Sequence, residues 1–271
     1  MFGKSVLLLF SFAALCMIGA MTISCGSSNS STVKPCTGGP YNVVGPWQMT
    51  VTDNGVAGSV TLYGAIDSSG LALFFDNSQL SGSGDTVQLP TITGACSFSG
   101  NVTAYGEPGG PNSGVVGTNP VQGNVTSSTA ISGTFSGNPS GTISLVPLSA
   151  LGTGTVTAVT GQKLGVVQGS FSLQSILLSL TFSQSGSNNS MSFTTTNLAG
   201  CLANGTFTEV GTSNVFDVSL TLMPTCPITG TFTGLGFESS TDYFGPNGGH
   251  PDTYLYMNIL DSTNSFVMEI Y

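Results

Sequence analysis

Alternation of apolar and polar residues is the feature that most restricts what this chain can fold into. In the stretch 216–222, one phenylalanine, one valine and two leucines alternate with Asp, Ser and Thr, and the stretch 47–51 follows the same rule. Side chains two residues apart share one face of a β-strand, whereas a helix needs a period near 3.6. The 38 glycines and 13 prolines interrupt any longer helical pattern. The sequence therefore predicts an all-β, antiparallel body of roughly twelve to fifteen strands, built as a sandwich or as a barrel.

A short motif recurs within this pattern. Residues 96–103, 201–208 and 226–233 each begin with Cys and carry Gly at the fifth position, and residues 131–136 repeat the motif without the Cys. Each half of the chain holds two copies in the same order. We therefore predict an internal duplication, with a first β half over 41–160 and a second over 161–271. Chance recurrence in a chain rich in Gly and Thr is the alternative.

The amino terminus has the pattern of an export signal. Lys4 precedes an apolar run over residues 6–18, and Ile23-Ser24-Cys25 follows it. These residues resemble a bacterial lipoprotein signal peptide, whose lipobox has an aliphatic residue, a small or aliphatic residue, a small residue and then Cys. Thr22 departs from that pattern, because leucine is usual there.

The resemblance implies a signal peptide over 1–24 that is cleaved before Cys25. It also implies a diacylglycerol on the Cys25 sulfur and a fatty acyl group, such as palmitate, on the new amino terminus. Residues 25–40, rich in Ser and Gly, would then be a flexible tether, and several acyl chains anchor a protein stably. An ordinary secretory signal or an uncleaved membrane anchor is the alternative.

The charge balance excludes several partners. The chain has three basic residues, all lysine, and 12 acidic residues, so loss of Lys4 with the signal leaves a formal charge of −10. Two lysines cannot neutralise a phosphate backbone or an anionic lipid surface, so we expect no nucleic-acid binding. The sequence also contains no P-loop and no dinucleotide-binding fingerprint, and we expect no cofactor.

The cysteines fit an oxidising compartment. Besides Cys25 and one Cys within the signal, Cys36, Cys96, Cys201 and Cys226 remain, and four cysteines allow three pairings. Two disulfides are expected in an exported protein, and the repeat favours Cys201 with Cys226 and Cys36 with Cys96. No CxxC spacing occurs and the chain has one histidine, so we expect no zinc site.

One segment gathers most of the chemistry that the sequence offers. Glu238, Asp242, His250 and Asp252 fall within residues 237–252, which we predict to be a long loop between two strands. Glu238, Asp242 and Asp252 can supply a carboxylate pair for glycoside hydrolysis or oxygen ligands for calcium, although acidic residues in such loops are commonly solvated turn residues. No G-x-S-x-G motif singles out a serine nucleophile.

These observations favour a lipid-anchored, extracytoplasmic protein of the cell envelope that acts as a binding or structural module and not as an enzyme. A carbohydrate or another envelope component is the expected kind of partner. The alternatives are an extracytoplasmic, glycosidase-like hydrolase that uses the acidic residues of 237–252, and a barrel that carries an apolar ligand in an open interior.

Overall fold

The computed structural model describes the body of the chain with several gaps. The predicted signal peptide, most of the tether, Cys25, Cys36 and Cys201 lie outside the described residues. Side chains are described everywhere in the ranges below except between 161 and 196. No helix within these ranges is long and apolar enough to cross a membrane. The described ranges are 39–55, 58–76, 86–106, 114–148, 161–168, 176–184, 190–196, 202–226, 229–240, 254–262 and 265–270.

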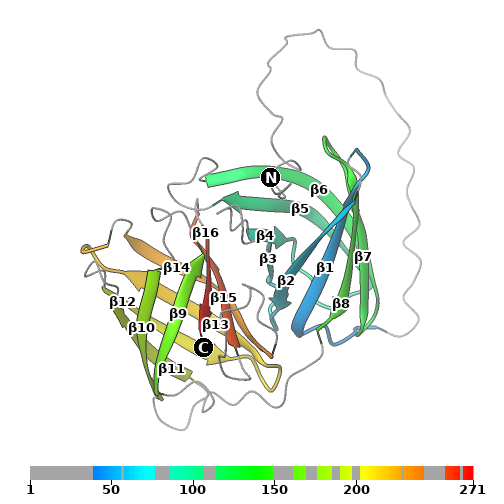
Figure 1. Cartoon of the computed structure of the whole chain (residues 1–271). Coiled ribbons are helices and arrows are strands. Elements are labelled where there is room, and N and C mark those ends of the chain that lie inside the picture. Colours follow the sequence, from blue (N-terminus) through cyan, green and yellow to red (C-terminus); the bar gives the residue numbers. More distant parts are fainter. Residues whose placement is uncertain are drawn as a thin grey trace, which may run out of the picture.

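The first eight strands form a closed antiparallel barrel (Figure 1). Each strand pairs with the next along the chain, and β8 pairs back with β1 to close the cylinder. The strands are β1 (Gly45–Asp53), β2 (Ser59–Ile66), β3 (Ala72–Asp76), β4 (Thr86–Leu89), β5 (Ser97–Gly106), β6 (Gly114–Ser127), β7 (Ala130–Phe135) and β8 (Gly141–Pro147).

The next eight strands form a second closed barrel with the same up-and-down order. Here β9 pairs with both β10 and β16 and so closes the cylinder. The strands are β9 (Gly161–Gln168), β10 (Ile176–Gln184), β11 (Ser190–Thr196), β12 (Leu202–Glu209), β13 (Val215–Leu222), β14 (Gly230–Ser239), β15 (Tyr254–Leu260) and β16 (Ser265–Ile270).

The predicted all-β antiparallel body is confirmed. Of the two architectures that the sequence left open, sandwich and barrel, both halves adopt the barrel. The sequence motif, however, does not occupy equivalent strands. Its copies fall in β5 and β7, the fifth and seventh strands of the first barrel, but in β12 and β14, the fourth and sixth strands of the second. The two halves share their topology, the motif is offset by one strand between them, and the duplication stays a prediction.

Inward-facing side chains fill the first barrel. In β1, Trp47 and Met49 are 2% and 0% exposed and belong to one continuous apolar cluster. Apolar side chains from each of the strands β2 to β8 join them. The protein's own residues therefore occupy the interior of this barrel. The buried members are Val43, Trp47, Met49, Leu62, Ile66, Ala72, Phe74, Val87, Leu89, Ile92, Phe98, Val102, Val121, Val125, Ile131, Phe135, Ile143 and Leu145.

The second barrel has its own apolar cluster, described for β12 to β16. Alternate residues point inward, as the pattern of 216–222 predicts. In β15 and β16, by contrast, every residue but Leu260 is buried, so these strands are covered on both faces. The buried members are Ala203, Phe207, Phe216, Val218, Leu220, Phe232, Leu255, Met257, Ile259, Phe266, Met268 and Ile270.

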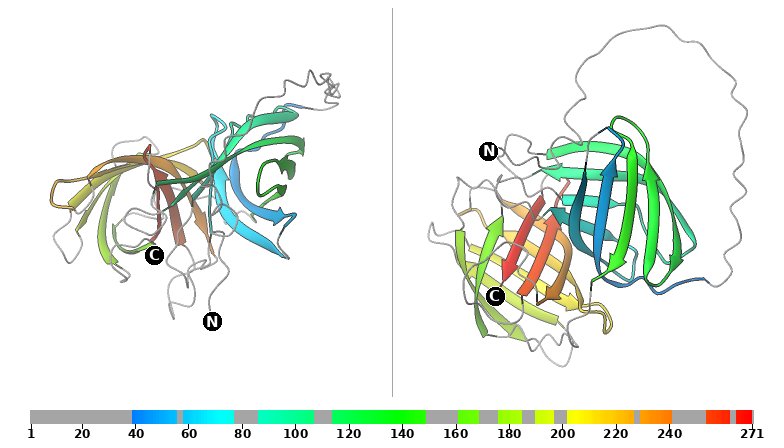
Figure 2. Two further views of the ribbon diagram at one scale, coloured as in Figure 1. Left: turned by 90° about the horizontal axis from the view of Figure 1, so that it is seen from above. Right: turned by 45° about the vertical axis from the view of Figure 1, so that its right-hand side comes forward.

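The two barrels lie side by side, with β14, β15 and β16 against β2, β3 and β4 (Figure 2). Outer positions that an isolated barrel would keep polar are apolar here and pack together. Phe75 of β3 lies against the second barrel, with ring centroids 6.1 Å from Phe237 and 5.7 Å from Tyr256. A buried hydrogen bond of 2.7 Å, from Thr86 Oγ1 to Asn258 Oδ1, crosses the same junction. The junction is therefore a third core, which makes the two barrels one unit.

Glycine permits close strand approach in the two walls that meet at this junction. A Cβ at Gly64 in β2 would overlap the backbone carbonyl of Leu73 in β3, and a Cβ at Gly234 in β14 would overlap that of Asn258 in β15. Gly64 also lies opposite Trp47 in the sheet, so the smallest residue faces the largest one. Glycines of this kind mark tightly bent corners of barrels.

Candidate functional site

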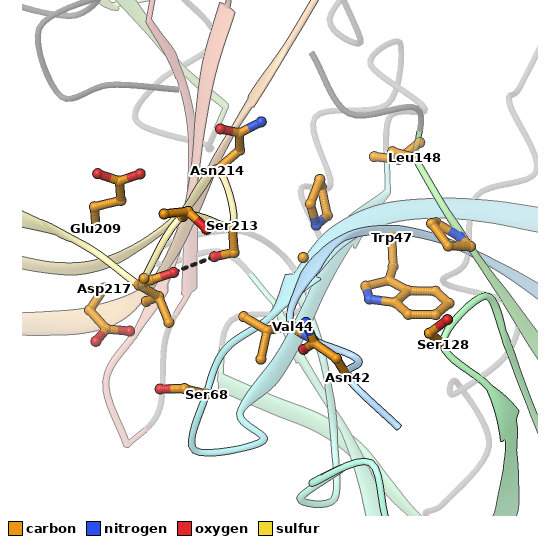
Figure 3. Close-up of a pocket in the computed structure, with 16 residues that line it drawn as sticks. Asn42, Val44, Trp47, Ser68, Ser128, Leu148, Glu209, Ser213, Asn214 and Asp217 are labelled. Atoms are coloured by element: carbon orange, nitrogen blue, oxygen red, sulfur yellow. Dashed lines mark hydrogen bonds between the residues drawn. The ribbon is translucent and has the colours of Figure 1, made fainter. Parts of the chain in front are cut away.

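A pocket of about 690 Å³ lies where the rim of the first barrel meets the β12–β13 turn of the second (Figure 3). Both barrels contribute to its wall, and hydroxyl, amide and carboxylate groups are mixed there with apolar side chains. The lining residues are Asn42, Val44, Gly45, Pro46, Trp47, Ser68, Ser128, Pro147 and Leu148 from the first barrel and Glu209, Val210, Gly211, Thr212, Ser213, Asn214 and Asp217 from the second.

Local hydrogen bonds fix the β12–β13 turn. The backbone N–H of Val210 donates to the carbonyl of Val215 at 2.8 Å, and Ser213 Oγ donates to the carbonyl of Val210 at 2.5 Å. Asn214 has a φ of 58° and Gly211 a φ of 65°, both in the left-handed region that Asn and Gly tolerate best. The turn therefore presents a set geometry to the pocket.

The rim of the first barrel is held in a similar way. Trp47 Nε1 donates to the carbonyl of Val43 at 2.8 Å, which holds the indole between the interior and the pocket. Asp67 closes the β2–β3 turn, because its Oδ1 accepts from Ser69 Oγ and from the backbone N–H of Leu71, each at 2.8 Å. Both walls of the pocket are thus set by hydrogen bonds that need no ligand.

The pocket is acidic. Burial raises the pKa of Glu209, and burial together with the charge of Asp67 raises the pKa of Asp217. All three lysines and the histidine of the chain lie outside the residues whose side chains are described, so no described basic side chain offsets these carboxylates. The described lining therefore disfavours an anionic ligand.

Glu238 does not line the pocket, but like Glu209 it takes an inward position of the second barrel. The register pairs Glu238 with Leu255 and Glu209 with Phe216, and both partners point inward. Glu238 is 5% exposed, and its Oε1 has no hydrogen-bond partner among the described residues. Burial first, and the charge of Glu209 second, raise the pKa of Glu238 to about 7.

The structure corrects the predicted loop at 237–252. Phe237, Glu238 and Ser239 belong to β14, which continues to Ser239. The reason is that the inward positions 234 and 236 are glycines, so the apolar side chains that would reveal the strand are missing from that face. Asp242, His250 and Asp252 lie outside the described residues, and Glu238 is the one predicted site residue of this segment that is placed.

Sequence reasoning missed Glu209 and Asp217. A signal for Glu209 exists, since the alternation of Ala203, Gly205 and Phe207 continues to position 209 and puts a carboxylate on an apolar face. Asp217 alternates outward from β13, and only the second barrel's contact with the first brings it near Asp67.

The structure describes two of the four cysteines that are predicted to form disulfides, Cys96 and Cys226. Cys96 and Cys226 are each disulfide-bonded. Cys226 Sγ lies 3.2 Å from the carbonyl oxygen of Leu202, the residue next to Cys201. Cys36 and Cys201 themselves lie outside the described residues, so the pairing stays a prediction.

The raised pKa of Glu238 predicts how stability depends on pH. A glutamate that titrates near 4.5 when unfolded and near 7 when folded keeps a proton that the unfolded chain releases between these values. The free energy of unfolding should therefore fall as pH rises through this window, by on the order of 3 kcal/mol, because one pKa unit corresponds to about 1.4 kcal/mol. Glu238→Gln should remove most of this slope and be more stable than the wild type above pH 7, measured by urea denaturation at several pH values. An unchanged slope would show that Glu238 is not the titrating group.

The carboxylates, amides and hydroxyls of the pocket can accept hydrogen bonds, and the nearby Glu238 can exchange a proton near neutral pH. Among the described residues, no group of three or more His, Cys, Asp or Glu side chains is placed to hold a metal ion.

Comparison with known proteins does not identify a family for this chain, since no family model, no curated protein and no solved structure matches it.

Proposed function

We propose that this is a lipid-anchored protein of the cell envelope, whose two-barrel body acts as a binding module with its site in the pocket between the barrels. The observation that carries the proposal is the pocket itself, which is walled by hydrogen-bonding groups of both barrels. Because the barrels share a buried core beside it, the pocket is preorganised, and less conformational entropy is lost when a ligand binds.

The lining favours a hydroxyl-rich ligand such as a carbohydrate. Carboxylates, hydroxyls and amides such as those of Asp217, Ser68 and Asn42 are suited to accepting and donating hydrogen bonds with sugar hydroxyls. Acidic groups without a described cation disfavour phosphates and nucleic acids. An apolar ligand inside the first barrel is disfavoured because that barrel's own side chains occupy its interior.

Trp47 provides a direct test of this site. It is the single tryptophan of the chain, it lines the pocket and it is 2% exposed, so its fluorescence should report a bound ligand. Ser128→Phe, which adds bulk to the pocket wall, should abolish the fluorescence response of the full chain to envelope saccharides. Thr129→Phe is the matched control, because Thr129 is the exposed neighbour in the same turn but does not line the pocket. An equal response in both variants would place binding elsewhere.

The anchor and the disulfides are part of the same proposal. We expect the mature chain to begin at an acylated Cys25 and to pair Cys36 with Cys96 and Cys201 with Cys226. Mass spectrometry of the mature amino terminus and of non-reduced peptides measures both. An intact leader, or an unmodified thiol at position 25, would contradict the anchor.

A hydrolase is the second candidate, and Glu238 is the observation that favours it. A buried carboxyl with a pKa near 7 beside a second carboxylate resembles the acid and base pair of glycoside hydrolysis. If the protein is such an enzyme, Glu238→Gln should abolish the release of reducing ends from a saccharide that the pocket binds, while binding itself persists. If the wild type binds the saccharide without hydrolysing it, the hydrolase is excluded and the binding module is supported.

A further inference from the structure

A second concave site lies on the outer wall of the first barrel. It is a groove of about 370 Å³ between the end of β4, with the residues that follow it, and the outward side chains of β5. β5 supplies Ser99, Asn101 and Thr103, which alternate with the buried Phe98 and Val102. The groove is separate from the pocket between the barrels, because the two linings share no residue.

The groove forms because β5 is longer than β4. The pairing of β4 with β5 covers only residues 103–105 of β5, whereas β5 continues to Ser97 along β6. Past this pairing, Pro90 packs against Gly100, where an added Cβ would lie 2.7 Å from the Cβ of the proline. Proline also has no N–H with which to extend the ladder. The chain therefore leaves β5 at this point, and a hollow remains beside the strand.

Hydrogen bonds hold the wall of the groove in place without a ligand. The backbone N–H of Ile92 donates to the carbonyl of Gly70 at 2.9 Å, which ties the segment after β4 to the β2–β3 turn. The Tyr105 hydroxyl donates to Gln88 Oε1 at 3.1 Å, which orients the Gln88 amide and leaves its nitrogen as a donor. Polar groups that are already oriented lower the entropy cost of binding.

The chemistry of the lining is that of neutral hydrogen-bonding groups. The polar members are the amides of Gln88 and Asn101 and the hydroxyls of Thr91, Ser99 and Thr103. Each of these groups can both donate and accept hydrogen bonds, as a sugar hydroxyl does. Pro90 and two leucines add apolar surface on which the C–H groups of a sugar ring can lie.

The neutral lining separates the classes of ligand. None of the eight lining residues carries a charge, so an ion would lose hydration here without gaining a counter-charge. An extended peptide would bind by adding a strand to β5, but Pro90 already packs at that edge, against Gly100. A neutral sugar needs neither a counter-charge nor a free strand edge.

We infer that this groove is a second saccharide subsite, which binds a neutral sugar unit. The inference rests on the proposed function, in which the ligand is a carbohydrate, and it adds a contact outside the pocket between the barrels. The β2–β3 turn contributes to both sites, since Ser68 lines the pocket and Leu71 lines the groove. The two sites therefore belong to the same end of the first barrel.

The experiment records the backbone amide NMR signals of the full chain while maltotetraose or triacetylchitotriose, both neutral, is added. The signals of Ser99, Asn101 and Thr103 should shift, and trigalacturonate, which is anionic, should leave them unchanged. Asn101→Phe should abolish the ligand-induced shifts, and Asn101→Ala should weaken binding about threefold to tenfold, as for the loss of one neutral hydrogen bond. Asn124→Phe is the matched control, because Asn124 is an exposed residue of the neighbouring β6 that lines neither site.

Trp47 fluorescence separates this inference from the proposed function, because Trp47 lines the pocket and not the groove. A Trp47 response to either neutral sugar without shifts in the groove would overturn the second subsite and leave the pocket as the binding site. Shifts in the groove without a Trp47 response would support the subsite and contradict binding in the pocket. No response at either place would contradict both.

The remaining outcomes concern the groove alone. Equal loss of the shifts in Asn101→Phe and Asn124→Phe would place binding elsewhere and overturn the inference. Equal shifts with trigalacturonate would contradict a neutral subsite. Shifts caused by an acetylated Thr-Val repeat peptide, but by neither sugar, would show that the groove takes a peptide and would overturn the inference. Thermal melting of each variant checks that it is folded.

Discussion

Replacing Phe75 with alanine should lower the free energy of unfolding by about 3–5 kcal/mol, the usual cost of truncating a fully buried phenylalanine. The reason is its position, since Phe75 is 0% exposed although it points outward from the first barrel. Its ring packs on Phe237 and Tyr256 of the second barrel, so the cavity would open in the junction and not inside either cylinder. Urea denaturation followed by circular dichroism and by Trp47 fluorescence measures the change.

Val115→Ala is the matched control for this variant. Val115 is also an apolar residue of the first barrel, but it is 52% exposed, and its truncation should change stability by less than about 0.5 kcal/mol. Circular dichroism reports both barrels, while Trp47 belongs to the first alone. In the wild type the two signals should therefore change together. Separate transitions in the wild type, or a small effect of Phe75→Ala, would mean that the barrels fold independently.

Gly64→Ala and Gly234→Ala should each destabilise the protein by about 3 kcal/mol or more, at the upper end of the range for overpacked sites. In both cases the added methyl group would meet backbone atoms of the neighbouring strand, which cannot move without disturbing the sheet. Chemical denaturation of the two variants measures the effect.

Gly55→Ala controls for the loss of glycine itself. A Cβ at Gly55 would make an ordinary contact with Asp53 Oδ1, and its backbone is not in the left-handed region, so this variant should stay close to the wild type. A loss at Gly64 no larger than the loss at Gly55 would contradict the close approach of β2 and β3.

The fold class could be predicted from the sequence because strand alternation is a local property. The inward residues of β1 and β13, such as Trp47 and Val218, repeat every second position and need no knowledge of the rest of the chain. The alternation is weaker in strands such as β6 and β14, since glycine occupies inward positions, including Gly123 and Gly234, and provides no apolar side chain there.

The junction and the pocket could not be predicted in the same way. In the sequence, Phe75 and Tyr256 have the pattern of ordinary apolar strand residues. The neighbouring residues do not indicate that these two side chains face a second barrel. The sequence predicts Glu238 to be an acidic loop residue, whereas its burial depends on β14 continuing past two glycines. Its partner Glu209 is 29 residues away in sequence and comes near it only when β12, β13 and β14 pair side by side. Such sites depend on long-range pairing, which composition and spacing do not encode.

Closure of both cylinders has a consequence for solubility. Soluble β proteins usually protect exposed strand edges with charged residues that block edge-to-edge association, yet only 6% of this chain is charged. Among the described strands each one is paired on both sides, so the backbone offers no template to a neighbouring molecule. Ring closure thus takes the place of charged gatekeepers among the described strands.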